Sequence, residues 1–258
     1  MKGALAVAIE AALAAGRIQS DRKKNIGKIS PKGGHDLVTE VDYLCEQEII
    51  RIIKQRFPDH DFLAEESGTS QGTKSPRKWI IDPLDGTINY AHGVPCYCVS
   101  IALEEAGEVV VGVVYNPSLD ELFAAEKGQG ATLNSEPISV SAISDLKESL
   151  LVTGFTPEVV RSPNNNLKEF SRFLKACQAL RRPGSAAIDL CYTAMGRFEG
   201  FWEMRLHPWD VAAGVLLVRE AGGEVTRLDG SPFSIYDRDV LASNGRVHQD
   251  MVRILRDV

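Results

Sequence analysis

The chain has 258 residues, a formal net charge of -6 and ordinary contents of hydrophobic (44%) and charged (25%) residues, so it can bury a substantial core in one large domain or two small ones. The acidic balance leaves no basic footprint for nucleic acid, and no apolar run is long enough to span a bilayer. Five cysteines without paired spacing argue against a disulfide framework and for a reducing compartment, which favours a cytoplasmic enzyme.

The first segment, residues 2–21, is expected to be an amphipathic helix and not an export signal, because Glu10 interrupts its apolar run. The basic stretch that follows, residues 22–35, contains Pro31 and two adjacent glycines and is expected to be a loop. Its Lys32 is either a solvated surface residue or a cation that reaches over an anionic site.

A second helix is expected to follow Thr39, which can cap it, and to end before Pro58. Asp42 falls in the first turn of this helix. It either complements the helix dipole or serves as an outer ligand of a metal cluster.

Residues 61–64 indicate a short strand that ends at Glu65 and Glu66. Acidic residues at a strand end are commonly solvated. Because functional groups often gather at strand ends in α/β sheets, a glutamate here could equally point into a cleft beside Asp82.

The central stretch begins with a buried strand, residues 79–81, and is expected to turn sharply from Asp82 onward through a proline and a glycine. Asp82 and Asp85 can converge on one point, where either one carboxyl takes a proton or a cation lies between them. All-oxygen ligands suit Mg²⁺, Mn²⁺ or Ca²⁺. Gly86 and Thr87 would open a short helix whose free N–H groups can hold a phosphate. The alternative is that Asp85 caps this helix and Asp82 forms the turn.

Several antiparallel strands are expected next, at residues 96–104, 109–115 and 121–125, with further short strands near Gly128 and Asn134. Beyond them the pattern predicts a strand at 149–153 and a helix at 167–179. A helix that starts at Gly184 and Ser185 has arginines just upstream, so it offers an anion site or simple capping by the serine.

The last segment is expected to contain a strand at 198–204 that carries Glu203 and a helix after His207 that carries Asp210 in its first turn. Dipole complementarity is the alternative role of Asp210. A strand at 241–244 and a helix at 246–256 close the chain, and both His207 and His248 are expected to be structural or exposed.

Taken together, five motifs resemble the inositol monophosphatase family of metal-dependent phosphatases, and the resemblance covers nearly the whole chain. They are Asp36-Leu37-Val38-Thr39-Glu40-Val41-Asp42, Glu65-Glu66-Ser67, Asp82-Pro83-Leu84-Asp85-Gly86-Thr87, Arg182-Pro183-Gly184-Ser185-Ala186-Ala187 and Trp209-Asp210-Val211-Ala212-Ala213-Gly214. The resemblance implies an α/β fold built as a layered α-β-α-β-α sandwich. It also implies one domain over residues 1–258, with an N-terminal α+β half to about 145 and a C-terminal α/β half from about 146. A homodimer is the family default.

The resemblance also implies roles for particular residues. It makes Glu65, Asp82, the Leu84 carbonyl, Asp85 and Asp210 the metal ligands. Glu65 and Thr87 would orient the attacking water, and the backbone of Gly86 and Thr87 would hold the phosphate. The remaining substrate contacts would come from Asp85, Gly184, Ser185, Ala186, Glu203, Asp210 and one of Arg181 or Arg182. Around the metal cluster the resemblance places Lys32, Asp42 and Glu66.

The implied activity is hydrolysis of inositol 1-phosphate or a related sugar phosphate by metal-activated water, with two or three Mg²⁺. Mn²⁺ would be an alternative ion, and Ca²⁺ and Li⁺ would inhibit. Fructose 1,6-bisphosphate, histidinol phosphate, NADP and a 3′-phosphoadenosine compound are alternative substrates on the same fold. A regulatory, protein-binding relative with residual activity is a further alternative. A Ca²⁺-stabilised structural domain is disfavoured because the chain lacks the spacing of an EF-hand loop.

Overall fold

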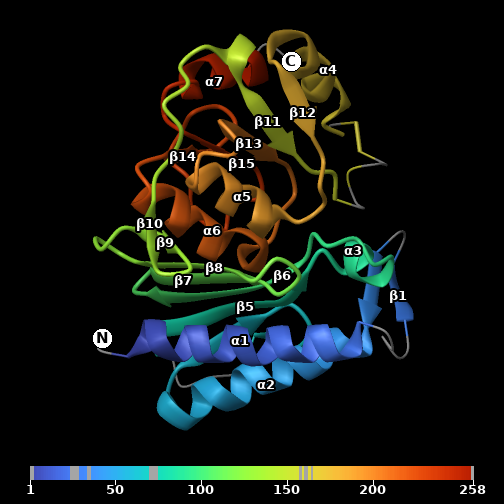
Figure 1. Ribbon diagram of the computed structural model, residues 1–258, viewed down its shortest axis with the longest axis vertical. Coiled ribbons are helices and arrows are strands. Elements are labelled where there is room, and N and C mark those ends of the chain that lie inside the picture. The colour runs from blue at the N-terminus through green and yellow to red at the C-terminus, as the bar shows by residue number, and fades with distance from the viewer. Residues whose placement is uncertain are drawn as a thin grey trace.

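The structure is a computed structural model that describes residues 3–23, 29–33, 36–69, 75–156, 159, 162–163 and 165–256, without the side chains of 29–33 and 36–38. Its helices and sheets stack in five layers (Figure 1). Two long helices, α1 (Ala4–Arg22) and α2 (Glu40–Arg56), form the first layer below a large sheet. Between that sheet and a smaller one lie α5 (Ala186–Ala194) and α6 (Pro208–Glu220). The outer layer is α4 (Leu167–Ala176) and α7 (His248–Arg256), so the expected α-β-α-β-α sandwich is confirmed.

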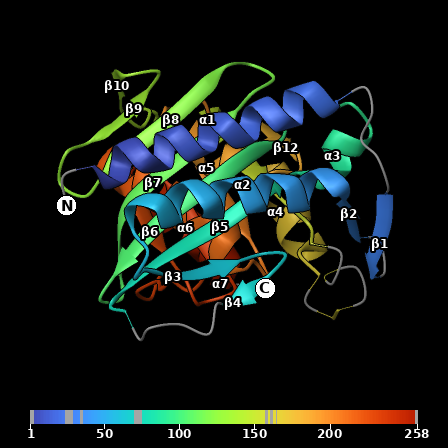
Figure 2. The same cartoon turned by 90° about the horizontal axis from the view of Figure 1, so that it is seen from below.

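The large sheet has eight strands in the order β10-β9-β8-β7-β6-β5-β3-β4, and only β3 and β5 pair in parallel. In Figure 2 α1 and α2 lie side by side across its outer face. The strands are β3 (Asp61–Ala64), β4 (Gly68–Thr69), β5 (Arg77–Asp85), β6 (Cys98–Glu105), β7 (Glu108–Asn116), β8 (Glu121–Glu126), β9 (Ala131–Leu133) and β10 (Glu136–Ile138).

The central strands read as continuous apolar runs because helices cover both of their faces. Alternate residues of β5 belong to different cores: Ile80 packs in the cluster with α5 and α6, whereas Trp79 and Ile81 pack in the cluster with α1 and α2. This period of two explains why the strand is apolar on both sides.

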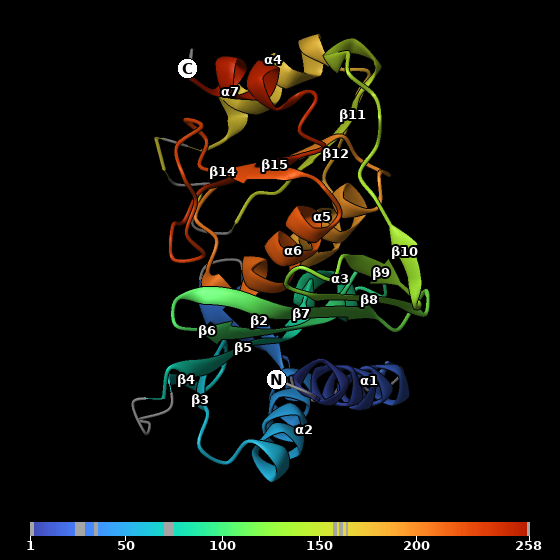
Figure 3. The ribbon, with the colours of Figure 1, turned by 90° about the vertical axis from the view of Figure 1, so that its left-hand side faces the viewer.

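The smaller sheet has five strands in the order β12-β11-β13-β15-β14. They are β11 (Leu150–Thr153), β12 (Ala179–Arg181), β13 (Gly200–Glu203), β14 (Glu224–Thr226) and β15 (Val240–Ser243). Because β11 is parallel to both β12 and β13, the carboxyl ends of these three strands meet at one edge. Figure 3 shows this sheet above α5 and α6. A third cluster, which includes Phe173 and Trp202, lies under α4 and α7.

Three expectations from the sequence are wrong. The stretch before Asp36 is not all loop, because β1 (Ile29–Gly33) pairs antiparallel with β2 (Asp36–Thr39) in a separate two-stranded ribbon. The helix expected to reach residue 179 ends at Ala176, and Ala179 is instead the first residue of β12. The strand before Asp82 does not end there but runs to Asp85.

The remaining elements are α3 (Thr87–Ala91) and a single 3₁₀ turn, η1 (Leu146–Glu148). None of the helices in the described ranges is both long and apolar enough to cross a membrane.

Candidate active site

The site is built around the carboxyl end of β5. The pairing of β5 with β6 shifts register between Asp82 and Asp85, a bulge that fits the proline between them because a bulged residue needs no ladder hydrogen bond. Asp82 is 2% exposed, and its Oδ1 accepts a hydrogen bond from the Leu84 N–H at 3.0 Å. Since bulges re-aim side chains, this irregularity lets both aspartates serve one site.

The chain leaves β5 through Gly86, which has a φ of 89° and precedes the short helix α3. A Cβ at this position would lie 2.7 Å from the Cys96 carbonyl oxygen, so only glycine fits. Thr87 is the first residue of α3, and its Oγ1 lies 2.9 Å from the Leu84 carbonyl oxygen and 3.1 Å from Asp42 Oδ1. The opening of a helix at Gly86 and Thr87 is therefore confirmed.

Asp42 links α2 to this turn. Its Oδ2 accepts hydrogen bonds from the Thr39 N–H at 2.8 Å and the Thr39 hydroxyl at 2.6 Å, which completes a capping box at the start of α2. Burial and, to a smaller extent, the charge of Glu66 raise the pKa of Asp42 to about 6, against the lowering effect of these hydrogen bonds. Asp42 thus caps its helix and also contacts Thr87.

Asp85 joins the two halves of the molecule. Its Oδ2 accepts a hydrogen bond from the Ser185 hydroxyl at 2.6 Å and another from the Ala187 N–H at 2.8 Å, at the start of α5. The Ser185 oxygen in turn accepts from the Ile188 N–H at 3.4 Å. Asp85 is therefore the anion at the N-terminus of α5. It does not cap α3, because the residue before α3 is Gly86, which provides no side-chain cap.

Asp210 lies in the first turn of α6, where its Oδ2 accepts a hydrogen bond from the His207 N–H at 2.7 Å. Burial raises the pKa of Asp210, and the negative charges of Asp85, Glu65 and Glu203 raise it further. Asp210 therefore stands in the first turn, where it can complement the helix dipole, the role given above as its alternative. The same carboxylate also lies within electrostatic reach of the β5 site.

Four carboxylates at this site act on one another. After burial, the largest influences that raise the pKa of Asp82 are the charges of Glu65, Asp85 and Asp210. Glu65 is held beside β5 because its N–H donates to the Ile81 carbonyl at 3.1 Å. Buried carboxylates without a nearby cation are costly, so they either bind protons or share a metal ion.

These residues suit a metal ion in their chemistry, because carboxylate and carbonyl oxygens are the ligands that Mg²⁺ and Ca²⁺ prefer. Across the described part of the chain, no three acidic, histidine or cysteine side chains stand close enough together to form a ready-made cage for one ion. The fit therefore rests on the oxygen chemistry of these residues and on the negative charges that act on the buried Asp82. The residues that could hold the ion are Glu65, Asp82, Asp85, Asp210 and the Leu84 carbonyl.

Glu203 and Gly154 lie at the carboxyl ends of β13 and β11. A Cβ on Gly154 would come within 2.2 Å of both Glu203 carboxylate oxygens, so the absence of a side chain there makes room for the glutamate. Burial and, to a smaller extent, the charge of Asp85 raise the pKa of Glu203 to about 8, against the lowering effect of the charge of Arg182. Glu203 thus lies within electrostatic reach of Asp85.

The two candidate arginines, Arg181 and Arg182, contact different parts of the chain. The exposed Arg181 donates from Nη1 to the carbonyl of its neighbour Leu180 at 2.9 Å. Arg182 donates from Nη2 to the Phe155 carbonyl at 3.2 Å, and its charge acts on Glu203. The geometry therefore favours Arg182 over Arg181 as the arginine near the site. Lys32 belongs to β1, but its side chain lies outside the described part of the structure.

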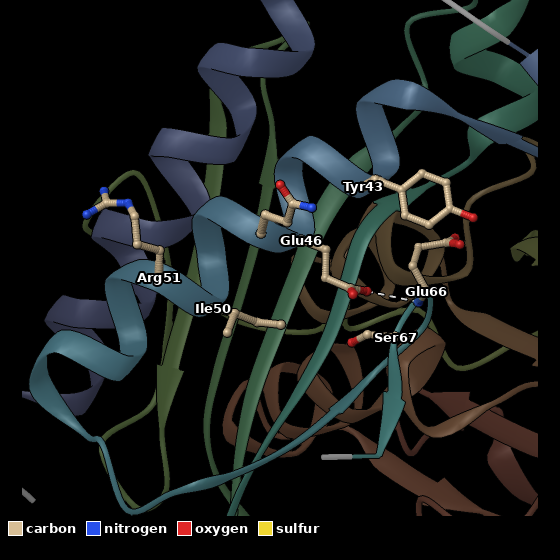
Figure 4. A pocket seen from close by; sticks show the side chains of 7 residues that line it. Tyr43, Glu46, Ile50, Arg51, Glu66 and Ser67 are labelled. Carbon is tan, nitrogen blue, oxygen red and sulfur yellow. Dashed lines mark hydrogen bonds between the residues drawn. The ribbon is translucent and has the colours of Figure 1, made fainter. Parts of the chain in front are cut away.

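Glu66 acts on Asp42 through its charge and also lines a separate pocket. Its N–H donates to Glu46 Oε2 at 2.9 Å, beside a pocket of about 450 Å³ on the outer side of α2 (Figure 4). That pocket is lined by Tyr43, Glu46, Gln47, Ile50, Arg51, Glu66 and Ser67. None of the β5 carboxylates lines it, so it is distinct from the site above.

Two contributors were not found from the sequence. Asn89 Nδ2 donates to the carbonyls of Cys96 (2.7 Å) and Pro183 (2.9 Å), which ties α3 to the segment before α5. Asp189 is buried in α5 near Glu203 and Asp85. Asn89 lies two residues after the Asp82–Thr87 motif, and this closeness is the signal that could have identified it. Asp189 gave no signal beyond its place early in a helix.

A layered α/β fold with acidic residues at strand ends and in the first turns of helices is typical of the class of metal-dependent phosphatases. The model of the inositol monophosphatase family matches residues 2–258. The chain therefore belongs to the inositol monophosphatase family and is a phosphomonoesterase, and this family is generally metal-dependent.

Relatives and solved structures agree with this membership. The chain is 48% identical to an inositol-1-monophosphatase of Synechocystis, covering 97% of this chain and 88% of that protein. It is 40% identical to the Nus factor SuhB of Escherichia coli, covering 98% and 96%. The structure of an inositol monophosphatase from Anabaena superposes with a TM-score of 0.91 at 45% identity, covering 98% of this chain and 95% of that one.

Proposed function

We propose that this protein hydrolyses inositol 1-phosphate or a closely related sugar phosphate in a Mg²⁺-dependent reaction. The observation that carries the proposal is that the charges of Glu65, Asp85 and Asp210 all act on the buried Asp82. The Thr87 hydroxyl bonds to the Leu84 carbonyl of the same turn. Two or three Mg²⁺ would occupy this cluster, Mn²⁺ could replace them, and Ca²⁺ and Li⁺ would inhibit.

The metal ions would be held by Glu65, Asp82, the Leu84 carbonyl, Asp85 and Asp210. When bound, they supply Lewis acidity toward water and toward the phosphate. The Thr87 hydroxyl, already in a polar network with Asp42, orients the attacking water together with the Glu65 carboxylate. No residue of the chain becomes phosphorylated in this scheme.

The substrate would lie between the two halves of the molecule. The backbone N–H groups at Gly86 and Thr87 hold the phosphate at the start of α3. On the other side Asp85, Gly184, Ser185, Ala186, Glu203 and Asp210 surround the hydroxyls. Gly184 has a φ of 95°, so a side chain there would strain the turn that enters α5.

Replacement of Asp82 tests the proposal. The Asp82→Asn variant should lose release of phosphate from inositol 1-phosphate with Mg²⁺, because it removes a buried ligand charge, and should remain folded by circular dichroism. A matched control is Asp250→Asn, at an exposed carboxylate on α7 that pairs with Arg253 at 3.2 Å, which should keep wild-type turnover. Full activity in Asp82→Asn would show that the ligand assignment is wrong.

The choice of substrate would depend on the residues around the hydroxyls. It would not depend on the metal ions themselves, which would contact only the phosphate. A panel that includes fructose 1,6-bisphosphate, histidinol phosphate, NADP and a 3′-phosphoadenosine compound, scored by released phosphate, would separate the alternatives. A kcat/KM for any of these above that for inositol 1-phosphate would replace the proposed substrate.

A second role as a protein-binding regulator is supported by the 40% identity to a Nus factor over 98% of the chain. We also propose a homodimer in the cytoplasm, the default of the family. Affinity capture from lysate and analytical ultracentrifugation test these points. No reproducible partner, or a monomer at micromolar concentration, would count against them.

A further inference from the structure

Gln19 is a fully buried polar residue near the carboxyl end of α1, where this helix lies beside α3 (Figure 2). Its side-chain Nε2 donates a hydrogen bond to the Pro83 carbonyl at 2.9 Å, within the part of β5 that carries Asp82 and Asp85. Because a carbonyl can only accept, the amide nitrogen of Gln19 must be the atom that faces Pro83. A side chain of the first helix layer thus reaches the backbone of the candidate site.

The other half of this amide does not contribute to stability. The Gln19 Oε1 atom is buried and accepts no hydrogen bond from any residue that the structure describes. A buried polar atom without a partner costs about 1–3 kcal/mol, so packing alone would favour an apolar side chain of the same length. What distinguishes glutamine from such a residue at this position is the hydrogen bond to Pro83.

This hydrogen bond fixes one peptide unit of the site. The Pro83 carbonyl and the Leu84 N–H belong to the same planar, trans peptide group and point in opposite directions from it. The carbonyl accepts from Gln19 on one side, and the N–H donates to Asp82 Oδ1 at 3.0 Å on the other. Rotation of this peptide unit would break both hydrogen bonds. Gln19 therefore fixes the direction from which the N–H approaches the Asp82 carboxylate.

Gln19 also contacts the far end of the same segment. Tyr90, the fourth residue of α3, is fully buried, and its hydroxyl donates to the main-chain carbonyl of Gln19 at 2.7 Å. One residue of α1 is thus bonded to the chain before and after the stretch from Leu84 to Thr87. That stretch contains the carbonyl, the carboxylate and the N–H groups that the proposed reaction uses.

We propose that Gln19 is a positioning residue for metal binding, which holds this segment of the chain through Pro83 and Tyr90. Held in this way, the Asp82 carboxylate and the Leu84 carbonyl are oriented for a divalent cation before the ion binds. Gln19 itself touches neither the ion nor the substrate. The inference rests on the proposed function and deepens it, because it names a residue of the first helix layer on which the affinity for Mg²⁺ depends.

The test compares Gln19→Met, which removes the donor and keeps the length of the side chain, with Tyr90→Phe, which removes only a hydroxyl. The dissociation constant for Mg²⁺ alone, measured by titration calorimetry on chelator-treated protein, should rise about tenfold in Gln19→Met, as for other residues that orient metal ligands from behind. Tyr90→Phe should raise it by a smaller factor, because the bond to Pro83 remains. Turnover of inositol 1-phosphate by Gln19→Met should recover at high Mg²⁺ concentration.

Asn244→Ala is the matched control for a lost buried amide. Asn244 is 4% exposed and also donates from its side chain to a backbone carbonyl, that of Ile143 at 2.8 Å. It follows β15 at the opposite end from Val240, the residue that pairs with Glu203. Asn244→Ala should lower the thermal unfolding midpoint and leave the dissociation constant for Mg²⁺ as in wild type. This control separates a loss of stability from a loss of positioning.

Hydrogen exchange tests the hold on the segment without any ion. In metal-free protein the amides of residues 84–90 should exchange faster in Gln19→Met than in wild type and in Asn244→Ala, because local opening of the segment becomes easier. Unchanged exchange, an unchanged dissociation constant in Gln19→Met, or an equal rise in Asn244→Ala would overturn the inference. The proposed function fails separately, if the wild-type protein does not bind Mg²⁺; the exchange rates then still decide whether Gln19 holds this segment.

Discussion

At the scale of single residues, the candidate site is defined by acids whose carboxyl groups are removed from water in the folded, metal-free protein. Burial is the first cause that raises the pKa of Asp42, Asp82, Asp210 and Glu203. Each of these carboxyls therefore lowers stability when it ionises in the folded protein. Since a packed apolar side chain often folds more stably at a buried position, these acids indicate a binding role beyond the helix starts that Asp42 and Asp210 complete.

The loss of stability on ionisation of a buried acid can be measured for Glu203 as a function of pH. Its pKa rises from 4.5 in the unfolded chain to about 8 in the folded protein, so folding takes up a proton between these values. The stabilising contribution is complete below 4.5 and is lost as pH rises to about 8. In metal-free protein, Glu203→Gln should therefore flatten the fall of the unfolding free energy between pH 5 and 8, measured with urea. An unchanged slope would show that Glu203 ionises normally in the folded state.

The sequence could predict the acids that form motifs but not those recognised by position alone. Asp82 and Asp85 stand close together in a turn-like motif, so their convergence could be inferred from spacing. Asp189 follows two alanines and an isoleucine in a helix, where an acid usually complements the dipole. The choice between Arg181 and Arg182 depends on which way each side chain leaves the end of β12, and a sequence does not contain that direction.

At the scale of elements, the passage from β5 to α3 depends on one glycine. Gly86 has a φ of 89° and no room for a Cβ against the Cys96 carbonyl. The fixed backbone here orients the N–H groups that would receive the phosphate. A distortion at this point should therefore affect stability and phosphate binding together.

Gly86→Ala should destabilise the protein by roughly 3 kcal/mol, about 1 for the left-handed backbone and the rest for the clash. Gly107→Ala is the matched control, since Gly107 has a φ of 87° with nothing within 4 Å of the added Cβ, and should cost about 1 kcal/mol with normal activity. Urea unfolding and phosphate release measure both. Equal losses of stability would mean that the contact with Cys96 relaxes freely.

Most elements could be predicted from periodicity, and the failures have local causes. The central strands and long helices carry enough apolar residues to fix their type, as β6 and α2 show. The missed strands β12 and β14 have three residues each, too few for a period to appear. Strand β1 contains Pro31 and Gly33, which favour a loop, yet strand pairing overrides that preference.

At the scale of the whole molecule, the site lies where the halves meet. Asp85 of β5 bonds to Ser185 and to the N–H of Ala187 on α5, and Asn89 after β5 reaches the Pro183 carbonyl. Asp210 comes from α6, which lies between the two sheets. A ligand at this junction would hold the two sheets together, so its binding should be visible in global stability.

Mg²⁺ should raise the thermal unfolding midpoint of protein treated with chelator, because an ion that binds only the folded state adds stability by mass action. At a concentration one hundred times the dissociation constant this amounts to about 2.7 kcal/mol, or roughly 5 to 10 °C for a chain of this size. Ca²⁺ should raise the midpoint as well while it suppresses phosphate release. Asp82→Asn should show little shift with either ion, because the variant lacks a buried ligand charge. A similar rise in wild type and variant would instead indicate ion binding at the acidic surface, away from the junction of the two halves.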